Sequence, residues 1–136
     1  MREERIEIRL HRGRIEELTA DERRGMDVAL AAAERAYAPY SGFHVGAAVE
    51  LADGRLVPGS NQENAAYPSG LCAERTALFT AGAQYPDVAV RALYVVAMKD
   101  GVVQDKISPC GGCRQVISEV EHRYGQSIRI YLCGRT

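Results

Sequence analysis

The sequence has no tryptophan, only two phenylalanines and almost no net charge, which is −1 at pH 7. This balance leaves no excess of basic residues to hold phosphates, so nucleic acid is not an expected partner. No apolar run is long enough to span a bilayer, so a membrane is not expected as a partner either. The opening fourteen residues, MREERIEIRLHRGR, are too charged for a secretory signal, and we expect a cytoplasmic protein.

Cysteine is also scarce, with four residues in the chain. In a reducing compartment, cysteines serve as metal ligands or free thiols more often than as structural disulfides. Cys110 and Cys113 lie in the stretch SPCGGCRQV, which by itself fits a redox pair as well as two metal ligands. Cys133 stands in a strand-like run, where a buried thiol is our interpretation and a fourth zinc ligand is the alternative.

The remaining composition is ordinary for a globular protein. Hydrophobic residues make up 46% of the chain and charged residues 26%. A chain of 136 residues is long enough to bury a core without disulfides or other staples. We find no internal repeat, low-complexity segment or linker, and expect a single domain over residues 1–136.

The first part of the chain predicts a strand followed by a helix. Residues 6–10 alternate apolar and polar side chains, which predicts a short edge strand. Thr19 and Glu22 form a capping box ahead of an alanine-rich helix that should run to about Ala36. The residues expected on the buried face of this helix are Met26, Ala29, Leu30 and Ala33.

Strand and helix patterns then alternate to the end of the chain. We expect strands at 44–51, from 56 toward 61, within 88–98 and at 128–132, with helices at 71–83 and 110–124. Asp53-Gly54 and Asp100-Gly101 are turn signals, and Gly125 should cap the last helix. This order predicts an α/β fold in which helices pack on one sheet.

The stretch LCAERTALF adds a third cysteine, Cys72, which also falls near the start of a predicted helix. Helix N-termini favour thiolate over thiol, so three thiolates could converge on one zinc ion if the two helices lie side by side. Three protein ligands leave a position for water, which zinc makes acidic enough to react near neutral pH. Glu74 could face that water and carry its proton to a substrate.

The spacing of these residues matches the zinc deaminase signature, in which Cys-x-Glu or His-x-Glu is followed by Pro-Cys-x-x-Cys. Here the two parts read CAE from Cys72 and PCGGC from Pro109. Three thiolates carry more negative charge than one zinc ion offsets, so a nearby cation is favoured. Arg75 and Arg114 directly follow the two motifs; we expect Arg75 to balance this charge and leave the role of Arg114 open.

Four blocks of the sequence closely resemble the small three-cysteine cytidine deaminases: AYAPYSGFHVGAA, NQENAAYPSG, LCAERTA and SPCGGCRQV. They occur in the same order as in that family and extend from about Tyr37 to Gln115. The resemblance implies a three-layer α/β/α fold with a central mixed sheet and one zinc ion per subunit. It also implies a homotetramer, with active sites at subunit contacts, that deaminates cytidine and deoxycytidine in pyrimidine salvage.

The resemblance assigns roles around the metal. It implies that the zinc ligands are Cys72, Cys110 and Cys113. Glu74 matches the proton shuttle, which would protonate N3 of cytosine and then the departing amine. Arg75 matches the arginine that donates hydrogen bonds to the zinc thiolates. Tyr67 matches a tyrosine near the subunit contact and the site.

It also assigns roles in binding a small-molecule nucleoside. Asn61 and Glu63 match the pair that holds the ribose hydroxyls, so free cytosine should be a poor substrate. Phe43 matches the aromatic residue that packs on the bound nucleoside. The backbone around Ala73 and Ser108 would meet the polar edge of the pyrimidine.

Two features depart from the family pattern. His44 stands where many relatives carry proline, and we interpret it as a local packing change. The family usually continues past IYLCGRT into another strand and a helix, so we expect these two elements to be missing from this sequence.

Other functions remain open on the sequence. A deaminase for another cytosine nucleoside, such as the antibiotic blasticidin S, would share the zinc chemistry, but Asn61 and Glu63 favour an ordinary ribose. A non-catalytic zinc-stapled domain would need zinc for folding and release no amine. A redox pair leaves Cys72 and Glu74 without a role, and a polynucleotide editor would need a basic groove.

Overall fold

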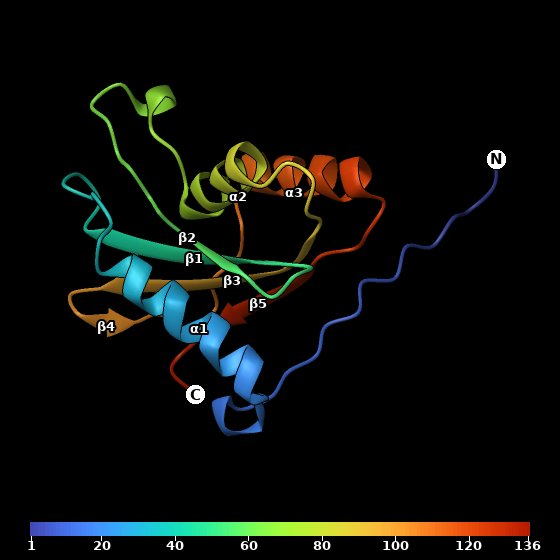
Figure 1. The fold of residues 1–136 in the computed structure, drawn as a ribbon, viewed down its shortest axis with the longest axis horizontal. Helices are drawn as coiled ribbons and strands as arrows, with labels where there is room; N and C mark the ends of the chain where they lie inside the picture. The colour runs from blue at the N-terminus through green and yellow to red at the C-terminus, as the bar shows by residue number, and fades with distance from the viewer.

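A mixed sheet of five strands runs through the centre of the molecule (Figure 1). The computed structural model describes residues 1–136. The strands are β1 (Phe43–Leu51), β2 (Leu56–Ser60), β3 (Val90–Lys99), β4 (Val102–Val103) and β5 (Arg129–Cys133). The helices are α1 (Ala20–Ala33), α2 (Ala73–Gln84) and α3 (Gly111–Tyr124), with 3-10 turns η1 (Ile15–Glu17) and η2 (Tyr67–Ser69).

The strand order places β1 and β3 in the middle of the sheet. β1 pairs antiparallel with β2 on one side and with β3 on the other. The far side of β3 pairs with the short antiparallel β4 and with β5, which is the parallel strand. In the chain, α3 follows β4 and precedes β5, so the PCGGC motif at the start of α3 lies in the helical layer.

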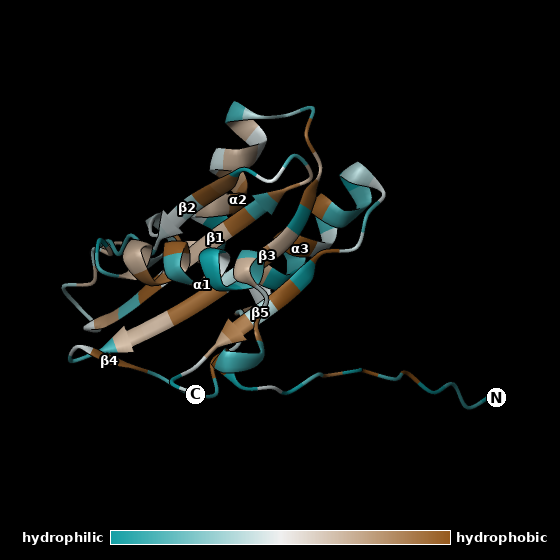
Figure 2. Ribbon diagram, turned by 60° about the horizontal axis from the view of Figure 1, so that its bottom comes forward, coloured by the Kyte–Doolittle hydropathy of each residue, from teal (hydrophilic) through white to brown (hydrophobic).

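Helices cover both faces of the sheet, as Figures 1 and 2 show. Alternate residues of β1 enter different cores: Ala48 packs with Met26 and Ala29 of α1, whereas Val49 packs in the core that contains Leu78 of α2 and Ile117 of α3. This alternation is what a strand buried on both sides requires. The predicted α/β fold, with helices in two layers around a central mixed sheet, is confirmed.

Two glycines let helices approach the sheet closely. A side chain at Gly46 would collide with backbone atoms of Ala29 and Ala33 in α1. A side chain at Gly59 of β2 would collide with backbone atoms of Ala73 and Ala77 in α2. Gly59 therefore fixes the depth at which the first turns of α2 sit on the sheet.

Most of the local predictions are confirmed. The Thr19–Glu22 capping box forms, with the Glu22 N–H donating to Thr19 Oγ1 at 3.2 Å and the Thr19 N–H to Glu22 Oε2 at 2.9 Å. The Asp53-Gly54 turn joins β1 to β2, and the Asp100-Gly101 turn joins β3 to β4. Gly125 ends α3 in the left-handed conformation at φ 61°.

The predicted end of the first helix is wrong by about three residues. α1 ends at Ala33, and the N–H groups of Arg35 and Ala36 donate to carbonyls three residues back. This tighter 3-10 pattern ends the α-helix before the chain turns toward β1. Leu30, predicted on the buried face of this helix, packs against the smaller core and is partly buried.

The predicted strand at residues 6–10 is not formed. This segment is extended and exposed, and no part of the sheet pairs with it. Alternation predicts which faces a strand would present, but a strand also needs a neighbour for its backbone. No helix in the structure combines the length and apolar character needed to cross a membrane.

Candidate metal centre and active site

Three thiols meet where the N-termini of α2 and α3 lie together. The Sγ atoms of Cys72 and Cys110 are 3.6 Å apart, and those of Cys110 and Cys113 are 3.5 Å apart. All three sulfur atoms lie within 4.8 Å of one another and none forms a disulfide. The convergence expected from the two cysteine motifs is therefore confirmed.

Local helix geometry explains this convergence. Cys72 and Cys110 are the N-cap residues of α2 and α3, both with extended backbone conformations. Cys113 follows in the first turn of α3, which brings its sulfur back beside Cys110. The unpaired N–H groups and partial positive charge of two helix ends are thus directed toward one cluster of sulfur atoms.

The cluster fits a zinc ion. Zinc–sulfur bonds of about 2.3 Å at tetrahedral angles place thiolates about 3.8 Å apart, close to the two separations observed. Burial, followed by the Glu74 carboxylate, raises the pKa of Cys113, whereas the backbone N–H of Cys113 lowers the pKa of Cys110. Holding all three as thiolates therefore requires positive charge among them, which a divalent cation provides.

Arg75 provides further positive charge beside the sulfurs. Its Nη2 donates to Cys72 Sγ at 3.5 Å, and its guanidinium lies against Gly112. Hydrogen bonds to the thiols of Cys72 and Cys113 raise the pKa of Arg75. The buried Nε atom of Arg75 has no hydrogen-bond partner. Its position fits the charge-balancing role expected from the sequence.

Glu74 is one of two buried charged residues, at 5% exposure. The other, Glu50, is paired with Arg91 at 3.1 Å, whereas Glu74 has no ion-pair partner. The Glu74 carboxylate is close enough to Cys113 to raise the pKa of that thiol. A buried carboxylate without a counter-ion, next to a cluster of thiols that can hold a metal ion, is suited to accept and return a proton.

The Asn61 side chain is clamped to the start of β1. Its Oδ1 accepts from the Val45 N–H at 2.8 Å, and its Nδ2 donates to the Phe43 carbonyl at 2.9 Å. An amide group has two N–H donors and two acceptor lone pairs, so one donor and one lone pair remain available. Asn61 therefore also holds the strand segment that carries the Phe43 ring.

The Glu63 carboxylate binds the turn that precedes β1. Its Oε1 accepts from the N–H groups of Tyr40 and Ser41 at 3.0 and 3.1 Å. Hydrogen bonds from the side chain and then the backbone of Ser41 lower the pKa of Glu63. The group is thus held ionised, and its second oxygen is not used by these two backbone donors.

A short backbone bridge connects this group of residues to the cysteine cluster. The N–H of Gln62 donates to the Leu71 carbonyl at 2.9 Å, and the N–H of Leu71 donates back at 3.0 Å. Leu71 directly precedes Cys72, so Asn61 and Glu63 flank a residue that is hydrogen-bonded next to the cysteine cluster. The sequence analysis did not single out Gln62, whose only signal was its place between Asn61 and Glu63.

The other predicted site residues lie around these two groups. Ala73 is fully buried at the first position of α2, and Ser108 is exposed in the loop that leads to Cys110. Tyr67 lies in η2 and projects its side chain into solvent. The structure therefore brings Ala73 to the cluster directly but leaves Tyr67 without a packing partner in this chain.

Arg114, whose role the sequence left open, holds the loop before the second motif. Its Nε donates to the Pro109 carbonyl at 2.9 Å. This bond ties the first turn of α3 to the residue that precedes Cys110. Cys133 is absent from the cysteine cluster; burial raises its pKa to about 11, as expected of a thiol in a core.

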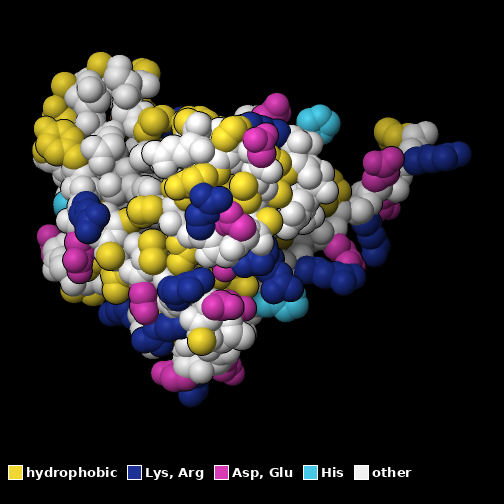
Figure 3. Space-filling view, in the orientation of Figure 1, with side chains coloured by type: hydrophobic (Ala, Val, Ile, Leu, Met, Phe, Trp, Pro, Cys, Tyr) yellow, Lys and Arg dark blue, Asp and Glu magenta, His cyan; other side chains and the backbone are white.

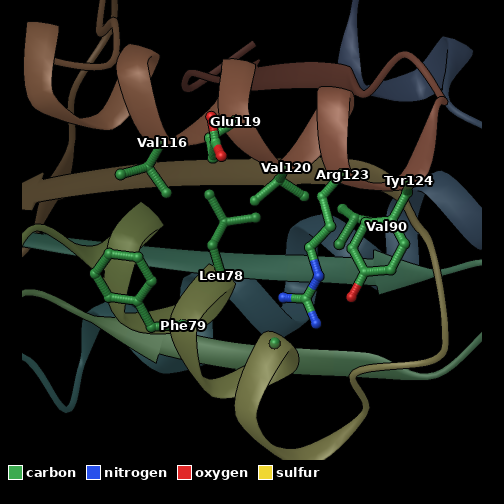
Figure 4. Close-up of a pocket in the computed structure, with 9 residues that line it drawn as sticks. Leu78, Phe79, Val90, Val116, Glu119, Val120, Arg123 and Tyr124 are labelled. Atoms are coloured by element: carbon green, nitrogen blue, oxygen red, sulfur yellow. The ribbon is translucent and has the colours of Figure 1, made fainter.

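A separate apolar groove lies between α2 and α3 (Figure 4). Its volume is about 270 Å³, and it is lined by Leu78 and Phe79 from α2 and by Val116, Val120 and Tyr124 from α3. It contains none of the three clustered cysteines, and its one carboxylate, that of Glu119, is exposed, whereas Glu74 is buried. The chemistry therefore belongs to the helix N-termini, not to this groove.

Comparison with known proteins agrees with this geometry. The sequence model of the family described as "Cytidine and deoxycytidylate deaminase zinc-binding region" matches residues 19–124. A cytidine deaminase from Sporosarcina psychrophila is 51% identical over 88 residues, 65% of this chain and 61% of the relative. One from Halalkalibacterium halodurans is 44% identical over 92 residues, 68% of this chain and 66% of the relative. The matches thus span less than two thirds of the length of these relatives.

Solved structures give the same result. A cytidine deaminase from Burkholderia pseudomallei has a TM-score of 0.60 at 45% identity, over 74% of this chain and 75% of that protein. A cytidine deaminase from Mycobacterium tuberculosis has a TM-score of 0.65 at 38% identity, over 84% and 86% of the two chains.

Proposed function

Because the chain belongs to the cytidine and deoxycytidylate deaminase zinc-binding family, we propose that it hydrolyses cytidine and deoxycytidine to the uridine forms and ammonia. The observation that carries this proposal is the cluster of three thiols at two helix N-termini, with the buried and unpaired Glu74 beside it. Cys72, Cys110 and Cys113 are the proposed zinc ligands, and Arg75 offsets part of their charge.

Glu74 is the proposed proton carrier. Zinc, when bound, supplies a water made acidic enough to attack C4 of cytosine near neutral pH. Glu74 accepts a proton from that water and delivers it to N3 as the oxygen adds to C4. Glu74 then takes the remaining proton of the added oxygen and transfers it to the exocyclic nitrogen, the C4–N bond breaks, and ammonia leaves. Oxygen has replaced nitrogen at C4, and the carboxylate returns to its ionised form.

Asn61 and Glu63 are the proposed ribose-binding residues. The spare N–H of the Asn61 amide can donate to a sugar hydroxyl, and the second oxygen of Glu63 can accept from one. Their bridge to Leu71 keeps these groups at a fixed separation from Cys72. Phe43 would pack on the nucleoside, and the backbone at Ala73 and Ser108 would meet the polar edge of the pyrimidine. Such a site disfavours free cytosine.

We further propose that residues 1–136 form one domain and that the protein assembles as a homotetramer. It would act in the cytoplasm, in pyrimidine salvage. The exposed aromatic side chains of Tyr67, Tyr40 and Phe79 support subunit contacts, because apolar surfaces of this kind are usually covered in assemblies. Light scattering coupled to gel filtration would test this state. A monomer at micromolar concentration would contradict the tetramer.

The reaction is tested by the ultraviolet spectrum of cytidine incubated with the zinc-loaded protein. Conversion to uridine with release of ammonia supports the proposal, and deoxycytidine, free cytosine and single-stranded DNA then rank the substrates. Folded, zinc-loaded protein that converts none of the nucleosides would contradict it. Conversion of blasticidin S alone would instead favour a deaminase for that class of nucleoside.

A further inference from the structure

We propose that Ser41 is a positioning residue for nucleoside binding, whose hydroxyl holds the Phe43 backbone in a fixed place relative to the Glu63 carboxylate. This role rests on the proposed function, in which Phe43 and Glu63 contact the nucleoside. Ser41 would act through these two residues and would not touch the ligand. The structural basis is a closed ring of hydrogen bonds around the start of β1.

Two loops meet at the end of the sheet where β1 begins. In the loop before β1, the N–H of Tyr37 donates to the Asn61 carbonyl at 3.0 Å, and the Tyr37 carbonyl accepts from the N–H of Glu63 at 2.9 Å. Figure 1 shows this loop and the loop after β2 at the same end of the molecule. In Figure 3 this end projects at the upper left and carries hydrophobic side chains on its surface. The backbone thus joins the loops at Tyr37, six residues before Phe43, and side chains make the remaining contacts.

The Ser41 hydroxyl binds the first residue of β1. It accepts a hydrogen bond from the Phe43 N–H at 3.0 Å. Gly42, between the two residues, has a φ of 65°, and this left-handed turn brings the Phe43 N–H back toward the hydroxyl. Ser41 therefore fixes the point at which the chain enters β1.

The backbone of Phe43 is held on both sides. Its carbonyl accepts from Asn61 Nδ2 at 2.9 Å, and its N–H donates to the Ser41 hydroxyl. Two side chains from different loops therefore set the orientation of this one residue. The direction of the Phe43 ring depends on both contacts.

Ser41 also contacts the Glu63 carboxylate. Its backbone N–H donates to Glu63 Oε1 at 3.1 Å, and its side chain contributes most to lowering the pKa of that carboxyl. A hydroxyl has one donor and two lone pairs, so it can accept from Phe43 and donate to Glu63 at the same time. Since Asn61 and Glu63 are two residues apart in the chain, these contacts form a closed ring.

This ring joins the two halves of the proposed nucleoside site. Glu63 would accept from a sugar hydroxyl, and the Phe43 ring would pack on the nucleoside. The covalent structure of a nucleoside fixes its sugar relative to its base, so a site with matching groups already in place loses less freedom on binding. Without the Ser41 hydroxyl, the Phe43 N–H loses its side-chain partner, and the two groups can move separately. Affinity should fall, whereas the cysteine cluster and Glu74 should be unaffected.

Steady-state conversion of cytidine by the zinc-loaded chain tests this role. Ser41→Ala should raise KM about fivefold and leave kcat within a factor of about two, which is the pattern of lost substrate binding. Ser41→Thr keeps the hydroxyl and should retain the wild-type KM. Ser60→Ala is the matched control. It removes a hydroxyl next to Asn61 in the chain that accepts from Gln62 Nε2 at 3.2 Å, so KM should stay unchanged.

Two further measurements do not require turnover. The dissociation constant of uridine, measured by calorimetry, should rise about fivefold in Ser41→Ala. Amide hydrogen exchange at Phe43 should accelerate by a similar factor in Ser41→Ala and stay at the wild-type rate in Ser41→Thr and Ser60→Ala. If the wild type converted no cytidine, the proposed function would be wrong, and these two measurements would still decide the role of Ser41.

Several results would overturn the role of Ser41. One is a KM in Ser41→Ala equal to that in Ser60→Ala, and another is a lower kcat at an unchanged KM, because the hydroxyl would then act on the chemical step. A KM in Ser41→Thr as high as in Ser41→Ala would show that the hydroxyl is not the group that matters. Failure of the wild type to bind uridine, or unchanged exchange at Phe43 in Ser41→Ala, would overturn the role whatever the activity.

Discussion

Replacing Gly59 with alanine should displace α2 from the sheet while the rest of the fold keeps its structure. The new Cβ would lie 2.8 Å from the Ala73 carbonyl oxygen and from Ala77 Cα, and closer still to the Ala77 N atom. Ordinary contacts of this kind are about 3.4 Å or longer, so the backbone of α2 must move away by about 0.6–1 Å. Overpacking of this extent costs about 1–3 kcal/mol of folding stability.

The same displacement moves Cys72 and Glu74, which begin α2, relative to Cys110 and Cys113 on α3. Disturbing the supports of a metal ligand typically weakens metal affinity about 10–100-fold. Gly46→Ala is the matched control, because its Cβ would collide with the backbone of α1 on the opposite face of the sheet. It should lower stability at least as much, because its contacts are closer, and leave the zinc affinity unchanged.

Thermal unfolding of the metal-free proteins and competition with a chelator measure the two effects separately. Each kcal/mol should lower the unfolding midpoint by about 3–6 °C in a chain of this size. If Gly59→Ala lost stability but bound zinc as tightly as Gly46→Ala, the contact between α2 and β2 would not be what positions the cluster.

Three further predictions follow. Hydrogen bonds from Thr19 and then Tyr131 lower the pKa of Glu22 below 4.5. The ionised carboxylate therefore stabilises the fold above that pH, and this stability is lost as pH falls through the lowered pKa. The unfolding midpoint of Glu22→Gln should fall less on acidification than that of the wild type. Asn61→Ala leaves the Val45 N–H and the Phe43 carbonyl without their side-chain partners and should lower the free energy of unfolding in denaturant by about 1–3 kcal/mol. Gln62→Ala, which removes an exposed amide, should lower it little. Cys72→Ser should abolish stoichiometric zinc in the purified protein, but Cys133→Ser should retain it, and equal zinc contents would contradict the ligand assignment.

Local rules were sufficient to predict much of this structure. The Thr19 cap, the Asp-Gly turns and the Gly125 cap depend on neighbouring residues and were predicted correctly. The cysteine cluster could be predicted because each motif placed its sulfur at a helix N-terminus, and the α/β order made it possible for two such ends to meet.

Features that depend on distant residues could not be predicted in this way. The strand expected at residues 6–10 failed because a strand requires a neighbour, which alternation does not specify. The clamp of Asn61 on β1 and the bond from Arg114 to Pro109 join groups whose contact is decided by the packed fold. The burial of Glu74 beside the thiol of Cys113 likewise appears only when the helices are assembled.

The most direct test of the account compares wild-type protein with the Glu74→Gln variant, both shown to hold one zinc ion per chain, in the conversion of cytidine to uridine. Removing the proton carrier while keeping the metal should lower the turnover rate by a factor of about 10²–10⁴. A variant that retains zinc and turns over cytidine at the wild-type rate would contradict the assignment of Glu74, and with it the proposed chemistry of the site.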